Sequence, residues 1–483
     1  MYSKTPLIFE QSKKGQIGAS LPKLDVPEFA LSSVIPDSLL RAIPAELPEV
    51  SEPEVVRHYT NLSVKNHHVD RDFYPLGSCT MKYNPKINDV ISGLPGFAGL
   101  HPLQSDESAQ GALKIIWELE QMLINITGME RVTLQPSAGA QGEFVGILMM
   151  KKYHESKNED RKYIIIPETA HGTNPASIVF SGYLTRQVAT DERGRVDIYD
   201  LKAKLDSDVA GMMLTQPNTL GLFEDRIEEI STLVHEVGGL MYMDGANLNA
   251  LIGIVRPADM GFDITHINLH KTFSTPHGGG GPGSGPIAVA EELTPFLPTP
   301  MVKKEDEKYC WDYEYPQSIG PIHGFYGNFS ILVRAWAFIK TMGESGLIAM
   351  TKQAVLNANY LKSLLEEKYH IPFSEGTLHE FVISGTKQKE RGIRVLDIAK
   401  SLLDYGYHAP TIYFPINVPE AMMIEPTESE TKQTLDNFAN TLLEIDKRID
   451  TESDTLIEAP EKTPVKRLDE TKANRELNLR WTK

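Results

Sequence analysis

The chain has 483 residues, of which 41% are hydrophobic and 23% are charged, and its formal net charge is −17. These values predict a globular protein with one large and one smaller domain. The negative charge argues against binding to nucleic acid or an anionic membrane surface, and no apolar run is long enough to span a membrane. With two cysteines, Cys79 and Cys310, a disulfide scaffold and a cysteine-rich zinc site are excluded. We expect a cytoplasmic protein, because the N-terminus also lacks the apolar core of a signal peptide.

Residues 1–89 are rich in proline and polar residues, and we expect an N-terminal arm and interface loops. Within them, FYPLGSCTMKYNP (73–85) predicts an ordered loop. From 90 to 344, apolar strands such as YIIIP alternate with helical patterns such as ALKIIWELEQMLINITG, which predicts a large α/β domain with a mostly parallel sheet. Residues 345–450 predict a small α+β domain, and residues 451–483 predict an extended, charged tail.

The stretch DITHINLHKTFSTPHGGGGPGSGP, from Asp263 to Pro286, predicts a strand over 264–269 that leads to Lys271 and then to a glycine-rich loop. Because the lysine precedes the glycines, the stretch does not match a P-loop. Most lysines are simply solvated. A lysine at a strand end beside a loop that lets the backbone approach a ligand suits an amine that forms an imine with a carbonyl cofactor.

Other strand ends carry groups that suit pyridoxal phosphate, since ligands of parallel α/β sheets bind at the carboxyl ends of the strands. Asp244 follows the apolar strand LMYM, where a buried carboxylate needs a cation such as a protonated pyridine nitrogen. Small residues opening a helix after a strand offer free N–H groups to a phosphate. The other candidate cofactor-binding residues are Gly139, Ala140 and Gln141 at that helix start, His171 and Ala246 against the two faces of the ring, Asn218 at the phenolic oxygen, and His270 at the phosphate.

Each of these groups also has an ordinary structural explanation. The small residues allow close packing of a helix on a strand, His171 can be satisfied by loop hydrogen bonds, and aspartate is a common helix N-cap. The order along the chain of phosphate turn, stacking ring, aspartate and lysine favours a common site. We therefore predict a pyridoxal phosphate site without a metal, with Lys271, Asp244 and His171 as catalytic residues.

The chain resembles the pyridoxal-phosphate-bearing half of the P-proteins of the glycine cleavage system, and is similar to the subunit 2 family of glycine dehydrogenase (decarboxylating). The resemblance extends from Tyr59 to about residue 436, over most of the chain. The segment YTNLSVKNHHVDRDFYPLGSCTMKYNP and the lysine loop are its most specific parts. The other motifs that carry it are AGAQGE, ETAHGTNPAS, TQPNTLGLFE, MYMDGANLNA, YGNFSILVRAWAFI, DYGYHAPTIYFP and MIEPTESETKQTLD.

This resemblance implies a fold-type-I pyridoxal phosphate enzyme, an aminomethyl-transferring glycine dehydrogenase. Glycine would form an aldimine with the cofactor, lose carbon dioxide, and pass its aminomethyl group to the lipoyl arm of H-protein. The resemblance also implies a homologous P-protein subunit 1 without the lysine, with two copies of each subunit in a heterotetramer.

Three points stay open at this stage. The group that binds the glycine carboxylate is not identified, and Arg334, His379 and His408 are candidates. Another fold-type-I enzyme, similar to cysteine desulfurases or aldolases, would share the lysine, aspartate and histidine but has no reason to carry the segment 59–85. A non-catalytic scaffold subunit would keep the fold, although retention of Lys271 with Asp244 argues against it.

Overall fold

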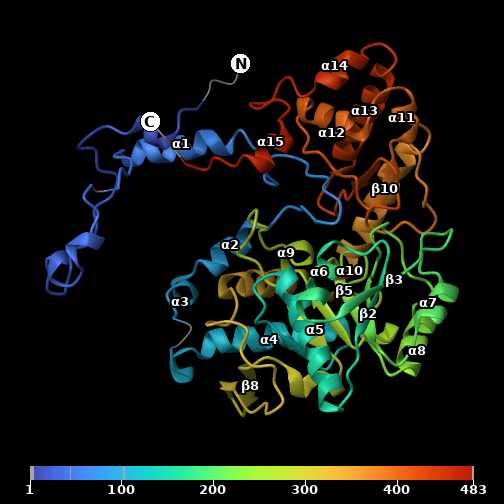
Figure 1. Ribbon diagram of the computed structural model, residues 1–483, viewed down its shortest axis with the longest axis horizontal. Coiled ribbons are helices and arrows are strands. Elements are labelled where there is room, and N and C mark those ends of the chain that lie inside the picture. The colour runs from blue at the N-terminus through green and yellow to red at the C-terminus, as the bar shows by residue number, and fades with distance from the viewer. Residues whose placement is uncertain (1–4, 44, 102–103, 481–483) are drawn as a thin grey trace. The chain divides into compact units, whose positions relative to one another are not determined.

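The computed structural model describes residues 5–43, 45–101 and 104–480. The chain falls into two compact units, residues 69–459 and residues 1–68 with 460–483 (Figure 1). The larger unit contains the strands and the cavity described below. The domain boundaries expected after residues 89, 344 and 450 stay predictions. The two compact units meet at residues 68/69 and 459/460, and the predicted large and small domains lie together in the larger unit.

The smaller unit contains helix α1, Glu52–Ser63, which was not predicted from the sequence, and the short helix α15, Glu470–Arg475. Helix α1 begins with a capping box, in which Oε2 of Glu54 accepts from the backbone N–H of Ser51 at 3.0 Å. Many large apolar side chains before this helix are exposed, among them Leu21, Phe29 and Leu39. An arm of this composition does not build a core of its own.

A seven-stranded sheet forms the centre of the larger unit, in the order β1-β7-β6-β5-β4-β2-β3. Strands β2 to β6 pair in parallel, and β7 pairs antiparallel with both of its neighbours, which confirms the predicted mostly parallel sheet. The strands are β1 (Arg131–Thr133), β2 (Tyr163–Pro167), β3 (Leu184–Val188), β4 (Val209–Thr215), β5 (Leu240–Gly245), β6 (Ile264–Ile267) and β7 (Ile287–Val289).

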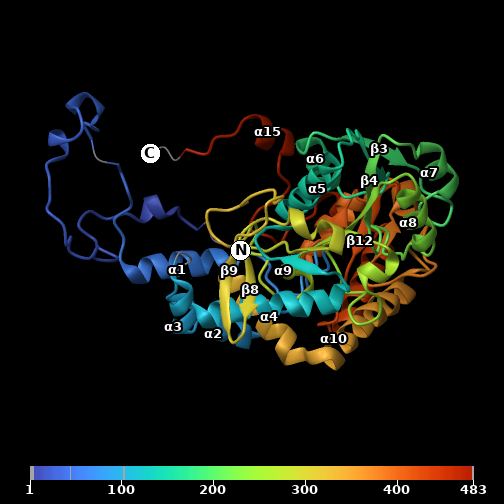
Figure 2. The ribbon, with the colours of Figure 1, turned by 90° about the horizontal axis from the view of Figure 1, so that it is seen from below.

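Both faces of this sheet are covered, as the apolar strand sequences predict. In β5, Met241 and Met243 belong to the core beneath one face, whereas Leu240 and Tyr242 belong to the core on the other. In Figure 2, α5 and α6 lie on one side of the sheet, and α4 and α10 lie on the other. The helices around the sheet are α4 (Gln110–Thr127), α5 (Gly139–Ser156), α6 (Thr173–Phe180), α7 (Ile198–Lys204), α8 (Ile227–Glu236), α9 (Leu269–Thr272) and α10 (Phe329–Leu365).

A second sheet of three strands, β10-β12-β11, lies in the C-terminal part of the larger unit. Its strands are β10 (Phe381–Ser384), β11 (Thr411–Ile412) and β12 (Ala421–Ile424), with helices α11 (Thr386–Glu390), α12 (Val395–Asp404), α13 (Lys432–Arg448) and α14 (Ser453–Glu458). Phe73, from the segment 73–85, packs in this core against Phe438. The remaining α-helices and strands of the larger unit are α2 (Lys86–Ser92), α3 (Pro95–Ala98) and the hairpin of β8 (Met301–Glu305) and β9 (Lys308–Asp312). No helix in the described part of the chain is long and apolar enough to cross a membrane.

Candidate active site

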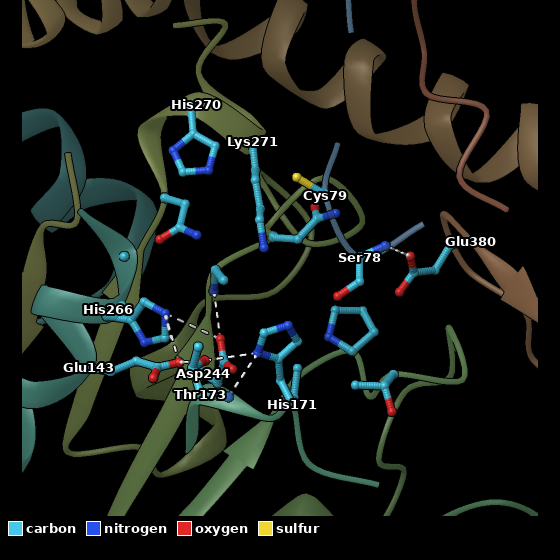
Figure 3. Close-up of a pocket in the computed structure, with 18 of the residues that line it drawn as sticks. Ser78, Cys79, Glu143, His171, Thr173, Asp244, His266, His270, Lys271 and Glu380 are labelled. Carbon is cyan, nitrogen blue, oxygen red and sulfur yellow. Dashed lines mark hydrogen bonds and ion pairs between the residues drawn. The ribbon is translucent and has the colours of Figure 1, made fainter. Parts of the chain in front are cut away.

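A cavity of about 270 Å³ opens at the carboxyl ends of β4, β5 and β6 (Figure 3). Thr215 ends β4, Asp244 lies at the end of β5, and Asn268 directly follows β6. All three residues line the cavity. The parallel sheet therefore brings polar side chains from neighbouring strand ends to one place.

Lys271 lines this cavity, but it does not lie directly at a strand end. Strand β6 ends at Ile267, and the chain then turns into the short helix α9, which carries the lysine. The carbonyl of Asn268 starts this turn by accepting hydrogen bonds from the N–H groups of Lys271 and Thr272. The predicted strand over 264–269 is therefore wrong at its end. In Figure 3 the Lys271 side chain points into the cavity.

Asp244 is held by three neighbours. The backbone N–H of Ala246 donates to its Oδ1 at 3.1 Å. Nδ2 of Asn174 donates to its Oδ2 at 3.0 Å, and Nε2 of His266 lies 3.3 Å from its Oδ1. Burial lowers the pKa of His266 to about 4, and its Nδ1 lies 3.2 Å from the hydroxyl of Tyr242. Burial opposes ionisation of Asp244, but His266 and Asn174 hold its pKa below the ordinary value. Asp244 is thus a fixed carboxylate that can meet a cation.

A second carboxyl group, Glu143, belongs to the same buried network. It accepts hydrogen bonds from the hydroxyl of Thr173 at 2.9 Å, the amide of Asn174 at 2.8 Å and the hydroxyl of Ser177 at 2.9 Å. Burial, reinforced by the charge of Asp244, raises the pKa of Glu143. Glu143 therefore keeps a proton at neutral pH, and Asp244 carries the negative charge of the pair.

The start of α5 has the features of the predicted phosphate-binding turn. Ala138 precedes the helix and has no side chain that can cap it, so the first N–H groups lack a side-chain partner. Gly139 leaves room for the side chain of Asn268, because a Cβ atom there would lie 2.0 Å from its Oδ1. Gly139 and Ala140 line the cavity. Gln141 is not among the described lining residues, because its side chain bonds the preceding loop, so its predicted role rests on its backbone N–H alone.

His171 and Ala246 both line the cavity, as a pair that stacks against a flat ring requires. Nδ1 of His171 lies 2.8 Å from the hydroxyl of Thr173, and burial lowers the pKa of this histidine. His270 also lines the cavity, and burial, with the charge of Lys271, lowers its pKa to about 3. A neutral His270 would meet a phosphate as a hydrogen-bond donor and not as a cation.

Asn218 lines the cavity, but its side chain is engaged elsewhere. Nδ2 donates to the carbonyl of Gly194 and to Oε1 of Glu224, both at 2.9 Å. Oδ1 accepts from the N–H groups of Leu220 and Leu222. A bond from Asn218 to the phenolic oxygen of the cofactor would replace one of these bonds, and it stays a prediction.

The segment 73–85 forms another wall of the cavity, where Ser78 and Cys79 line it. The buried ammonium of Lys82 lies 2.8 Å from the carbonyl oxygen of Thr272 and 2.8 Å from Oε1 of Glu428. This segment is therefore tied to the helix that carries Lys271. Burial raises the pKa of the Cys79 thiol, which keeps it neutral.

The three candidate carboxylate anchors lie in different places. His379 lines the cavity, whereas Arg334 and His408 are not among the described lining residues. Arg334 pairs with Asp89 at 2.8 Å, and His408 stacks on Tyr74 with ring centroids 3.8 Å apart. His379 is thus the candidate that the geometry favours.

The cavity walls suit a polar ligand such as pyridoxal phosphate. Among the described residues, Oγ1 of Thr215, Oδ1 of Asn268 and both ring nitrogens of His379 are buried without a hydrogen-bond partner. Such atoms are costly unless a ligand or water bonds them. Together with the free α5 N-terminus, the Asp244 carboxylate and the Lys271 amine, they match the phosphate, the ring nitrogen and the aldehyde of this cofactor.

Several residues of the site were not predicted to function there. Glu143 stands in the motif AGAQGE, and His266 stands in the strand before Lys271. Neighbouring residues in both stretches were predicted to bind the cofactor, but Glu143 and His266 were not. An acidic residue one turn into a helix that binds phosphate was the available signal for Glu143. No local pattern marks Ser78 or Glu380, which meet across 302 positions of sequence.

Comparison with known proteins identifies the family of the chain. The family model described as "Glycine cleavage system P-protein" matches residues 13–309, and "Glycine dehydrogenase, C-terminal domain" matches residues 350–467. A "Probable glycine dehydrogenase (decarboxylating) subunit 2" of Chloroherpeton thalassium is 57% identical over 99% of this chain and 98% of its own. A protein of the same name from Caldanaerobacter subterraneus subsp. tengcongensis is 55% identical over 99% of each chain.

Solved structures show the same fold at low identity. A glycine decarboxylase (P-protein) of the glycine cleavage system in inhibitor-bound form aligns with a TM-score of 0.73 and 19% identity, over 86% of this chain and 94% of that one. A NifS-like protein aligns with a TM-score of 0.60 and 16% identity, over 77% of this chain and 99% of that one. These likenesses confirm the fold-type-I architecture. With the family models and the curated relatives together, they establish that the chain belongs to the glycine cleavage system P-protein family.

Proposed function

We propose that the chain decarboxylates glycine with pyridoxal phosphate and transfers the remaining aminomethyl group to the lipoyl disulfide of H-protein. The observation that carries this proposal is that Lys271 and Asp244 face one cavity in a chain of the P-protein family. A scaffold subunit has no need of this pair. A cysteine desulfurase or aldolase reaction has no support beyond a shared fold.

The residues of the cavity divide the work of holding the cofactor. The N–H groups of Gly139 and Ala140 would bind its phosphate, and His171 and Ala246 would enclose its ring. Asp244 would stabilise the proton on the pyridine nitrogen. When bound, pyridoxal phosphate supplies the electron sink that stabilises the carbanion formed on loss of carbon dioxide.

The substrate side of the cavity is formed by Lys271, His379 and the segment 73–85. Burial lowers the pKa of His379, so a neutral ring with a free N–H faces the cavity, and we assign it to the glycine carboxylate. A carboxylate held there would keep glycine in one orientation while carbon dioxide leaves. The Lys271 amine would hold the aldehyde of the cofactor and, when it is free, could take or give a proton at the substrate.

The chain would have two protein partners. One is lipoylated H-protein, and the other is a homologous subunit without the lysine, which would form a heterotetramer of two copies of this chain and two copies of that subunit. The exposed apolar side chains of residues 17–47 support the second partner, because such surfaces usually mark contacts with another protein. A cytoplasmic location is part of the same proposal and is supported by the small number of cysteines.

The test combines a chemical and a kinetic measurement. Borohydride reduction of the loaded protein, followed by peptide mass spectrometry, should place the pyridoxyl group on Lys271. The wild-type assembly should exchange labelled bicarbonate into glycine in the presence of lipoylated H-protein, and Lys271→Ala should not. A pyridoxyl group on another lysine would refute the assignment of Lys271, and a fully loaded wild-type assembly without exchange would refute the function.

A further inference from the structure

Glu380 and Glu425 form a second pair of buried carboxyl groups beside the cavity, apart from the pair of Asp244 and Glu143. The two are held differently. Glu425 accepts hydrogen bonds from Thr80 Oγ1 at 2.7 Å, Asn247 Nδ2 at 3.1 Å and Asn249 Nδ2 at 3.2 Å. Glu380 lines the cavity, and its Oε2 accepts from the backbone N–H of Ser78 at 2.8 Å (Figure 3).

The surroundings of Glu380 favour its protonated form. Burial, together with the negative charge of Glu425, raises the pKa of Glu380 to about 8. The other titratable groups that face it are His379, whose Nε2 lies 3.9 Å from its Oε1, and the ammonium of Lys271. Cys79 lines the same wall. Glu380 is therefore a neutral acid at physiological pH, close to the pKa at which an acid donates protons most effectively.

The proposed reaction consumes a proton. When carbon dioxide leaves glycine, the electron pair of the broken C–C bond stays on the α-carbon. That pair forms a C–S bond with one sulfur of the lipoyl disulfide, and the S–S bond breaks with its electron pair on the other sulfur. The disulfide is thereby reduced, and the departing thiolate must take up one proton in each turnover.

We propose that Glu380 is the acid that protonates this departing sulfur, an inference that rests on the proposed function. Glu380 lines the same cavity as Lys271, and neutrality lets it face both a glycine carboxylate and a developing thiolate without repulsion. Asp244 and Glu143 are unsuited to this step because the cofactor ring and the Asn174 network engage them. After product release, solvent returns the proton to Glu380.

The experiment measures transfer to the disulfide as a function of pH. The chain, loaded with pyridoxal phosphate and assembled with its partner subunit, is given labelled glycine and lipoylated H-protein, and released carbon dioxide and new thiol are followed. The wild-type rate should fall about tenfold per pH unit above pH ~8, as Glu380 ionises. Glu380→Gln should lower the rate at pH 7 by at least ~100-fold and abolish this fall, whereas Glu380→Asp should restore part of both.

Two further readouts separate a catalytic from a structural role. Addition of glycine should change the absorption band of the bound cofactor equally in the wild type and in Glu380→Gln. In Glu380→Gln one component of the infrared C=O absorption of protonated carboxyl groups should be lost at pH 7, while the component from Glu143 stays. Glu430→Gln is the matched control, because Glu430 is a partly buried carboxyl with a pKa raised by burial to about 7, and it does not line the described cavity.

Carbon dioxide release by the wild type tests the proposed function, and the rate and pH profile of Glu380→Gln test the role of Glu380. If the wild type releases no carbon dioxide, the proposed function fails, and the inference fails with it. If the wild type is active and Glu380→Gln keeps the wild-type rate and pH profile, the inference alone is overturned. It is also overturned if Glu380→Gln loses the absorption response to glycine, because Glu380 would then serve binding, or if Glu430→Gln removes the pH dependence.

Discussion

At the scale of single residues, Asp244 and Glu143 share one donor, since the amide of Asn174 donates to both carboxyl groups. A buried pair of this kind does not carry two negative charges at low cost. The backbone N–H of Ala246 also donates to Asp244, and Nε2 of His266 lies 3.3 Å from it, so the negative charge of the pair resides on Asp244. The cavity thereby presents one fixed carboxylate to a cofactor.

Replacing Asp244 with Asn should leave part of the cofactor bound and remove most of the activity. The amide cannot stabilise a protonated ring nitrogen, and a hydrogen bond to a charged group is worth about 1.5–3 kcal/mol. Cofactor affinity should therefore fall by roughly ten- to a hundredfold, measured by titration with pyridoxal phosphate. The loss of turnover should be larger than the loss of affinity, because a protonated ring nitrogen is needed to stabilise the carbanion. Wild-type turnover with full cofactor would contradict this role.

Replacing Glu143 with Gln should make stability less dependent on pH. The pKa of Glu143 is raised from 4.5 to about 8 by burial and by Asp244, so the folded chain keeps a proton that the unfolded chain loses near pH 4.5. The contribution of Glu143 to the free energy of unfolding is therefore largest below pH 4.5. It falls as the pH rises from 4.5 to 8, by up to about 1.4 kcal/mol per pH unit. Urea unfolding of the cofactor-free protein at several pH values should give a shallower fall for Glu143→Gln. Equal slopes for the two proteins would contradict the assignment.

The residues that the sequence predicts well are those whose signal is local. Lys271, Asp244 and His171 each stand in a short motif at or just after a strand, and all three line the cavity. The second carboxyl pair was not predicted, because Thr80 and Glu425 meet across 345 positions and no short motif encodes that contact. The engagement of Asn218 was missed for a related reason, since its partners lie in a loop shaped by tertiary packing.

At the scale of elements, the strand predicted over 264–269 stops at Ile267 because the hydrogen bonds from Lys271 and Thr272 to the carbonyl of Asn268 start helix α9. β-Branched composition alone does not reveal such a turn. The prediction for the segment 73–85 was more successful. Its many turn-forming residues predicted an ordered loop, and the segment forms an ordered wall of the cavity. Lys82 is the contact that joins these two elements.

Replacing Lys82 with Met should therefore loosen both elements. Its side chain is 1% exposed and pairs with Glu428, which would be left without its cation. Breaking a buried pair from one side costs about 3–5 kcal/mol. Lys86→Met is the matched control in the neighbouring helix, because the pair of Lys86 with Asp70 is about half exposed and should contribute about 0–1 kcal/mol. Urea unfolding of the two variants gives the comparison, and equal losses would contradict the proposed anchor.

At the scale of the whole molecule, the alternation of apolar strands and amphipathic helices was sufficient to predict the parallel sheet and the edge at which the cavity lies. The arm was harder to predict, because helix α1 depends on a capping box in a polar, proline-rich context. The exposed apolar residues before α1 are a feature of the described chain that its own fold does not explain.

We predict that these residues bind the homologous subunit and that the chain alone is poorly active. Leu21 is 92% exposed, Phe29 73% and Leu39 75%, and a permanent interface of about 2,000 Å² or more would bury such side chains. The combined variant Leu21→Asp, Phe29→Asp and Leu39→Asp should bind the partner subunit at least ~10-fold more weakly in sedimentation or light scattering, because charged residues are disfavoured at the core of an interface.

The control for this assembly is Tyr199→Asp, since Tyr199 is an equally exposed aromatic residue, at 84%, on helix α7 of the larger unit. It should leave partner binding and bicarbonate exchange unchanged. The pyridoxyl group trapped on Lys271 should be the same in the control and in the arm variant, because the cavity lies within residues 69–459. The arm variant should therefore keep its cofactor and regain exchange only at high concentrations of the partner subunit. Full exchange activity from the wild-type chain without a partner, supplied with H-protein and pyridoxal phosphate, would refute the prediction.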